Sequence, residues 1–281
     1  MSRLTTRPSK IAIERRLSDQ VSCRTPGSNL MRVGWRGLMA CACACACVLP
    51  VHAAAAADGA LGESLLAPPH RADFVSAQPS AQARYVADWV VDAGDNQRLP
   101  FALVDKVAAQ VFVFDAGGRL LGAAPVLLGL AVGDDAVPGI GQRKLSSIRP
   151  EERTTPAGRL VAALDRNLHG TEVLWVDYEG AISLHPVITG NAKEQRAQRL
   201  ASATPLDNRI SYGCINVPVA FYKDVVHPAF TGTHGIVYVL PEVRSPQQVF
   251  AAYDVTARHA PSLAVAEHPA ATDLAQTTVR R

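Results

Sequence analysis

The chain has 281 residues, of which 48% are hydrophobic and 19% charged, and its net charge is +3. This length and apolar content support a sizeable core and exclude a wholly disordered chain. The first 57 residues hold eight of the 28 basic residues and two of the 25 acidic ones, which leaves a net charge of −3 on residues 58–281. That balance predicts no general basic face and therefore no nucleic-acid partner.

Residues 31–57 have the layout of a secretory signal peptide. Two arginines precede an uncharged apolar run from Leu38 to Val51, and small residues up to Ala57 follow it. A bilayer span needs about 20 apolar residues, so this run is too short to stay in a membrane. We therefore expect export to the periplasm or cell envelope and no stable membrane span in the mature protein.

Other interpretations of the N-terminal region stay open. The stretch "LMAC" up to Cys41 faintly resembles a lipoprotein cleavage site, although little apolar sequence precedes it. The alternating Cys-Ala tract could form a strand or bind a metal, but metal sites favour spaced pairs of cysteines. Residues 1–30 have no clear role and fit a mis-called start, with Met31 as the initiator.

Removal of the signal peptide leaves one of the six cysteines, Cys214, in the mature chain. Cysteines in an oxidising compartment normally pair. A single thiol there indicates a reactive group or an intermolecular bridge, and a buried cysteine that acts as a small hydrophobe is the alternative.

The mature chain is predicted to start with a linker or arm over residues 58–99, which contains a short helix at 81–94. From residue 100 onward, short runs rich in β-branched and aromatic residues alternate with turn residues, which is typical of strands. The expected strands cover 101–106, 110–115, 120–133, 154–164, 172–178, 181–187 and 235–242. Pro186 cannot donate to a ladder, so the 181–187 strand is expected to stop at His185.

Two helices are expected among these strands. Residues 191–203 carry many charges and predict a surface helix, and the apolar spacing of 217–230 predicts a helix that starts just after Cys214. The fold class is therefore mainly β, a sandwich or barrel-like domain over residues 100–242 with one or two helices. An Ala-rich tail, 243–281, is expected to be helical around 249–253 and then disordered.

The residues around Cys214 suit a nucleophile. Gly213 removes a side chain from the approach to the sulfur, and its backbone can direct N–H groups toward the oxyanion that forms after attack. A helix beginning near Val217 would favour the thiolate. His185, at the end of a predicted strand, is the best candidate for the base, and His169 is the second choice.

The stretch "SYGCIN", Ser211 to Asn216, resembles the Ser/Thr-His-Gly-Cys-x-Arg/Asn signature of the L,D-transpeptidases, which have a YkuD-like catalytic domain. The stretches "DKVAAQVFVFDAGGRLLGAAPVLLG", "TTPAGRL" and "GIVYVLP" are similar, in order, to other strands of that domain. The resemblance covers residues 100–242. It implies Cys214 as the nucleophile and His185 as the base, with a backbone carbonyl as the third partner of the histidine.

The same resemblance implies roles for the flanking residues. The N–H groups of Gly213 and Cys214, together with Tyr212, would form the oxyanion hole, and Ser211 and Asn216 would order the loop. Tyr212 departs from the family pattern, because the family has a histidine there. Arg209 could steer a substrate carboxylate, with an exposed charge as the alternative.

A second departure lies between the histidine and the cysteine. Pro186 follows His185 where the family usually has glycine, and 29 positions separate His185 from Cys214, more than is common in the family. The extra length holds the predicted helix 191–203. We interpret it as a lid or specificity insert, so that its replacement by a short loop should change substrate choice but leave thiol acylation intact.

The function implied is acyl transfer on peptidoglycan stem peptides through a Cys214 thioester, with carbapenem-type β-lactams as possible acylating agents. A hydrolase of the same substrate and a cell-wall-binding module impaired by Tyr212 are the alternatives. A redox role is disfavoured because no C-x-x-C occurs in the mature chain. No metal or other cofactor is expected, since the mature chain also has no H-E-x-x-H.

Overall fold

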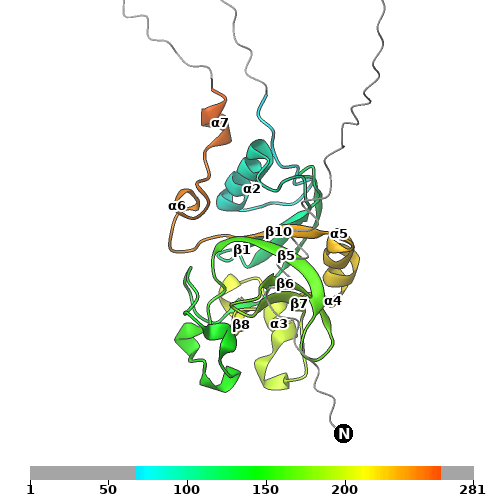
Figure 1. The fold of residues 1–281 in the computed structure, drawn as a ribbon, viewed down its shortest axis with the longest axis vertical. Helices are drawn as coiled ribbons and strands as arrows, with labels where there is room; N and C mark the ends of the chain where they lie inside the picture. Colours follow the sequence, from blue (N-terminus) through cyan, green and yellow to red (C-terminus); the bar gives the residue numbers. More distant parts are fainter. Residues whose placement is uncertain (1–67, 261–281) are drawn as a thin grey trace, which may run out of the picture. The chain divides into compact units, whose positions relative to one another are not determined.

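The computed structural model describes residues 68–260 (Figure 1). The predictions for residues 1–30, for the signal peptide at 31–57, for the start of the arm at 58–67 and for the last part of the tail lie outside these described residues.

One eight-stranded sheet dominates the fold, in the order β3-β2-β1-β10-β5-β6-β7-β9. The mainly β class predicted from the sequence is thereby confirmed. The strands are β1 Phe101–Asp105, β2 Gln110–Phe114, β3 Leu120–Pro125, β5 Gly158–Arg166, β6 Glu172–Asp177, β7 Ile182–Pro186, β9 Ile215–Val217 and β10 His234–Val239. A small second sheet pairs β4, Leu128–Gly129, with β8, Arg209–Ser211.

The two edges of the large sheet meet just after β3. Leu127 and Asn216 exchange both backbone hydrogen bonds, at 2.8 and 2.9 Å, so the chain leaving β3 lies against β9. The β4–β8 pair continues this seam. The sheet is therefore nearly closed, and β9, the strand that follows Cys214, lies at the seam.

The interior of the curved sheet is filled by side chains that alternate along its strands. Ala102 and Val104 of β1 face this core, as do Leu184 of β7 and Ile215 of β9. A helical segment covers it from α4, Val219–Phe221, through a π-helical turn, Tyr222–Val226, to α5, His227–Phe230. Pro228 follows the π turn as the second residue of α5, and it has no N–H to donate to the carbonyl of Asp224 in that turn.

A second core lies on the other face of β1, β2 and β10. Helix α2, Ala81–Ala93, packs Val86 and Trp89 there, and Phe101 and Leu103 of β1 point toward it. The short helices α6, Pro246–Phe250, and α7, Val255–Arg258, complete the layer (Figure 1). The folded unit thus includes most of the expected arm and the start of the expected tail, because β1 needs apolar cover on both faces.

Three local expectations need correction. Residues 191–203 form no single helix: the 3-10 turn η4, Ala192–Glu194, and α3, Arg196–Leu200, are separated by Gln195 at φ 49°. Strand β7 runs one residue past His185, because Pro186 still pairs with Val217. Strand β9 occupies 215–217, so the following helix begins at Val219 and not at 217.

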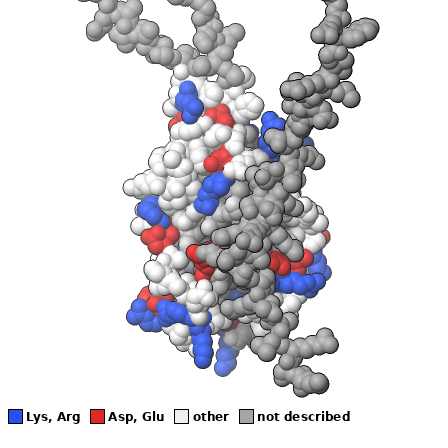
Figure 2. Space-filling view, viewed as in Figure 1, with Lys and Arg blue, Asp and Glu red and all other residues white. Residues whose placement is uncertain are grey.

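The surface carries charges of both signs. Figure 2 shows acidic and basic side chains interspersed over the face drawn. Within residues 68–260, no helix combines the length and the apolar character that a membrane crossing requires.

Candidate active site

Parallel pairing of β7 with β9 brings the predicted nucleophile and base together. His185 lies opposite Asn216 in the register, and Leu184 lies opposite Ile215. Because side chains alternate along strands, Ser183 and His185 share one face with Cys214 and Asn216, away from the apolar core. The Ser183 hydroxyl lies 3.7 Å from the Cys214 sulfur, and the half-buried thiol also donates to the Ala181 carbonyl at 3.7 Å.

The thiol and the imidazole lie on the same face of the β7–β9 pair, and each shifts the pKa of the other. Burial alone would raise the pKa of Cys214, but the interaction with the positively charged His185 ring and the contacts with Ser183 outweigh burial and lower it. Burial alone would lower the pKa of His185, but the Cys214 thiolate raises it above its usual range. Both directions favour a thiolate–imidazolium pair, which is the nucleophilic form of such a site.

The His185 ring is oriented by two further groups. Its Nδ1 lies 2.8 Å from the Pro186 carbonyl oxygen, which can only accept a hydrogen bond. The neutral ring therefore carries its proton on Nδ1 and leaves Nε2 unprotonated. Asn216 Nδ2 lies 3.3 Å from the same Nε2. The Pro186 carbonyl is the third partner that the sequence could not identify.

A tight turn holds the backbone before the sulfur. Ser211 Oγ donates to the Cys214 carbonyl at 2.7 Å and accepts from the Gly213 N–H at 3.0 Å. Gly213 adopts φ 128°, a conformation that side-chain-bearing residues rarely reach. A Cβ at this position would lie 2.8 Å from the Thr154 carbonyl oxygen and 2.6 Å from Ile182 Cδ1. Glycine is required here by both torsion and space.

Thr155 ties this turn to the seam. Its buried hydroxyl donates to the Gly213 carbonyl at 2.8 Å and accepts from the Gly129 N–H at 2.8 Å. Thr155 belongs to the stretch "TTPAGRL", which the sequence singled out only as a strand. Its role in bracing the cysteine turn depends on a contact 58 residues away in the chain.

Two arginines from different segments of the chain contact the neighbours of Cys214. One contacts Tyr212, two positions before it, and the other contacts Asn216, two positions after it. Arg153, at the end of the 3-10 turns that span residues 140–152, lies 4.0 Å over the Tyr212 ring. Arg196, in the insert between β7 and β8, donates to Asn216 Oδ1 at 2.6 Å. Both contacts were missed from the sequence, because an arginine in a charged surface segment has no distinguishing local signal.

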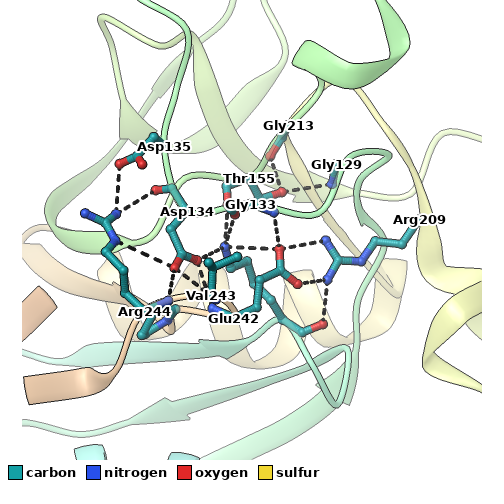
Figure 3. A network of polar contacts seen from close by, with 12 residues as sticks. Gly129, Gly133, Asp134, Asp135, Thr155, Arg209, Gly213, Glu242, Val243 and Arg244 are labelled. Atoms are coloured by element: carbon teal, nitrogen blue, oxygen red, sulfur yellow. Dashed lines mark hydrogen bonds and ion pairs between the residues drawn. The ribbon is translucent and has the colours of Figure 1, made fainter. Parts of the chain in front are cut away.

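Arg209 belongs to a buried charge cluster (Figure 3). Its side chain is 12% exposed and pairs with Glu242, so the alternative of an exposed charge is wrong. The fully buried Lys106 ammonium lies 3.3 Å from Glu242 and 3.0 Å from Asp134, and it also donates to the Thr155 carbonyl at 3.1 Å. This cluster thus reaches the cysteine turn through Thr155, while Arg209 secures the start of β8.

The other predicted base is not at the site. His169 is exposed in the turn between β5 and β6. In the described part of the chain, no three His, Cys, Asp or Glu side chains are grouped so that they could hold a metal ion.

Comparison with known proteins gives distant structural likenesses. No protein-family model and no curated protein matches the chain. The helical cell shape determining protein Pgp2 of Campylobacter jejuni is 14% identical, with a TM-score of 0.36 over 56% of this chain and 55% of that one. The matched region thus spans about half of that protein.

The catalytic domain of the Enterococcus faecium L,D-transpeptidase is 16% identical, with a TM-score of 0.29 over 50% of this chain and 96% of that one. The Ldtfm–avibactam carbamoyl enzyme is 15% identical, with a TM-score of 0.30 over 51% of this chain and 49% of that one. Likeness at this level does not establish a shared reaction.

Proposed function

We propose that the protein is an exported cysteine acyltransferase that acts on peptidoglycan stem peptides by L,D-transpeptidation. The observation that carries the proposal is the placement of Cys214 and His185 on one face of the β7–β9 pair, where their interaction lowers the pKa of the thiol and raises the pKa of the imidazole. Such a pair is the signature of an activated thiol nucleophile. The substrate class comes from the resemblance of "SYGCIN" to the L,D-transpeptidase signature.

In the first half-reaction, His185 Nε2 takes the thiol proton and the Cys214 sulfur attacks the carbonyl carbon of a diaminopimelate residue. A C–S bond forms, and the amide bond to the terminal D-alanine breaks. The imidazolium returns its proton to the departing amine, so D-alanine leaves neutral at nitrogen. The His185–Pro186 hydrogen bond keeps the ring in the orientation that serves both transfers.

In the second half-reaction, an amine of another stem attacks the thioester carbonyl. His185 takes the proton of that amine, the C–S bond breaks, and the sulfur regains its starting state. The negative charge that forms on the carbonyl oxygen in both halves needs N–H donors. The Gly213 N–H already donates to Ser211 Oγ, so we assign this role to the N–H groups of Tyr212 and Cys214.

Other parts of the proposal rest on the sequence. The signal peptide at 31–57 would place the mature protein in the periplasm or cell envelope, where its substrate lies. A carbapenem would acylate Cys214 through the same attack. The catalytic unit would be centred on residues 100–242, with α2 and the C-terminal helices as its cover.

The test is incubation of the pure protein with peptidoglycan, digestion, and mass spectrometry of the fragments. New cross-linked dimers are expected from the parent protein, and neither Cys214→Ala nor His185→Ala should form them. The His169→Ala variant is the matched control and should retain activity. Full activity of His185→Ala would contradict the assigned base.

The same digest separates the alternative functions. Shortened monomers without dimers would mean that water is the acceptor and that the protein is a hydrolase. No product of either kind and no adduct of a carbapenem on Cys214 would reject the enzyme and favour a binding module.

A further inference from the structure

The insert between β7 and β8 reaches the catalytic pair through one side chain. Arg196 of α3 is 14% exposed, donates from Nη1 to Asn216 Oδ1 at 2.6 Å, and pairs through Nε with Glu194. Asn216 is fully buried, and its backbone is held at the seam by Leu127. The side-chain amide of Asn216 therefore has two available orientations, which differ by the exchange of Oδ1 and Nδ2.

Arg196 determines which of these two orientations the amide adopts. A guanidinium can only donate, so it requires the amide oxygen of Asn216. The amide nitrogen then faces His185 Nε2 at 3.3 Å and the Cys214 carbonyl at 3.4 Å, which both accept. With the amide turned around, its oxygen would face Nε2 and would favour a proton there.

We propose that Arg196 is a positioning residue that, by fixing the amide of Asn216, favours the neutral form of His185 with an unprotonated Nε2. The proposal rests on the proposed function, since it concerns the base of Cys214. The amide N–H and the positive charge of Arg196 both oppose an imidazolium. They thereby counter the Cys214 thiolate, which on its own would hold the ring in the charged form.

The charged and titratable groups that face the ring come from three elements. Cys214 lies directly before β9, Arg196 is on α3, and Glu194 in η4 compensates part of the Arg196 charge. After the effect of burial, Cys214 raises and Arg196 lowers the pKa of His185. A base balanced in this way can release its proton to the leaving amine, which a ring held permanently as imidazolium would do poorly.

The contact of Arg196 with Asn216 gives the insert between β7 and β8 a second expected role. A short loop in place of the insert should alter the base itself as well as substrate choice, because it removes Arg196. The expectation that thiol acylation survives such a replacement therefore no longer follows.

The experiment is NMR titration of the His185 ring in the Cys214→Ala protein, where the thiolate no longer contributes. The resonance is assigned by its loss in a His185→Gln variant. Arg196→Gln should shift the titration midpoint upward, and Arg196→Lys, which keeps a charge and a donor, should return it toward the parent value. The matched control is Arg199→Gln, which removes an arginine of the same helix that bonds Glu194 and Asp207 carbonyls but not Asn216.

An unchanged midpoint in Arg196→Gln, or an equal rise in Arg199→Gln, would overturn the proposal. Should Arg196→Gln fail to fold, ¹⁵N shifts of the neutral ring in Cys214→Ala decide the point. The proposal expects protonated Nδ1 and bare Nε2, and a proton on Nε2 would refute it. These readouts need no acyl transfer, so their failure is separate from failure of the proposed function.

Discussion

At the scale of single residues, the cysteine turn depends on Gly213 as much as on Cys214. Gly213 has a left-handed torsion, and a Cβ at this position would lie only 2.8 Å from the backbone oxygen of Thr154. The sequence indicated the first requirement, because a glycine beside a nucleophile suggests an unusual turn. It could not indicate the second, because Thr154 is about 60 residues away in the chain.

Gly213→Ala should therefore displace the cysteine turn. We expect a loss of about 1–3 kcal/mol in the free energy of unfolding, since the new side chain meets both torsional strain and a backbone atom that cannot yield. Urea unfolding and the rate of Cys214 alkylation measure the two effects. Gly190→Ala is the control, because a Cβ there meets nothing within 4 Å. Equal stability of the two variants would contradict the argument.

At the scale of elements, one hydroxyl joins the segment before β5, the strand β4 and the cysteine turn. Thr155→Val keeps the shape of the side chain but leaves the Gly129 N–H and the Gly213 carbonyl without their partner. The expected cost is about 1–3 kcal/mol of stability, with slower alkylation of Cys214. Valine in place of the exposed Thr171 should change neither quantity. A Thr155→Val protein with parental stability and thiol reactivity would show that the brace is dispensable.

Element boundaries show where local sequence patterns are sufficient. Helix α2 ends at Gly94 in the left-handed region, as its Gly-Asp-Asn stretch predicts. The 191–203 helix is broken because Asn191 and Glu194 make local contacts that compete with a continuous ladder. The strand β9 was missed because three residues at a seam carry too little pattern to predict.

At the scale of the whole molecule, a buried cluster of charges connects the first strand, the cysteine turn and the C-terminal end of β10. Lys106→Met leaves Asp134 and Glu242 buried without their ammonium. We expect a loss of about 3–5 kcal/mol in the free energy of unfolding. Arg244 contacts Asp134 from a side chain that is 40% exposed, so Arg244→Gln should cost less than about 1 kcal/mol. Similar losses of unfolding free energy in Lys106→Met and Arg244→Gln would contradict the view that burial of the ammonium determines its contribution.

The same cluster predicts an acid-sensitive fold. Burial alone would raise the pKa of Asp134, but backbone N–H groups of Arg244 and Glu242 and the Lys106 ammonium lower it from 3.8 to about 2. A carboxyl with a depressed pKa stabilises the fold fully above its unfolded value and loses that contribution as pH falls toward the folded value. Stability should therefore fall between about pH 4 and pH 2, and less steeply in Asp134→Asn. The measurement is the urea midpoint of unfolding at several pH values in this range. An equal decline of the midpoint with pH in the parent protein and in Asp134→Asn would refute the prediction.

The sequence indicates the candidate reactive residues of this site better than the residues that hold them in position. Cys214 and His185 could be singled out by residue type and strand position, and the mainly β class by the strand runs. Arg196, Thr155 and Lys106 could not, because their roles arise from contacts between segments far apart in the chain. The cover formed by residues 72–99 was also missed, since only the packed sheet shows that β1 is apolar on both faces.

The central claim is that Cys214 is a nucleophile activated by His185. Intact-protein and peptide mass spectrometry after incubation with a carbapenem tests it most directly. We expect one adduct per chain, located on the peptide that contains Cys214 and formed much more slowly by His185→Ala. A parent protein that stays unmodified, or an adduct that maps to another residue, would contradict it.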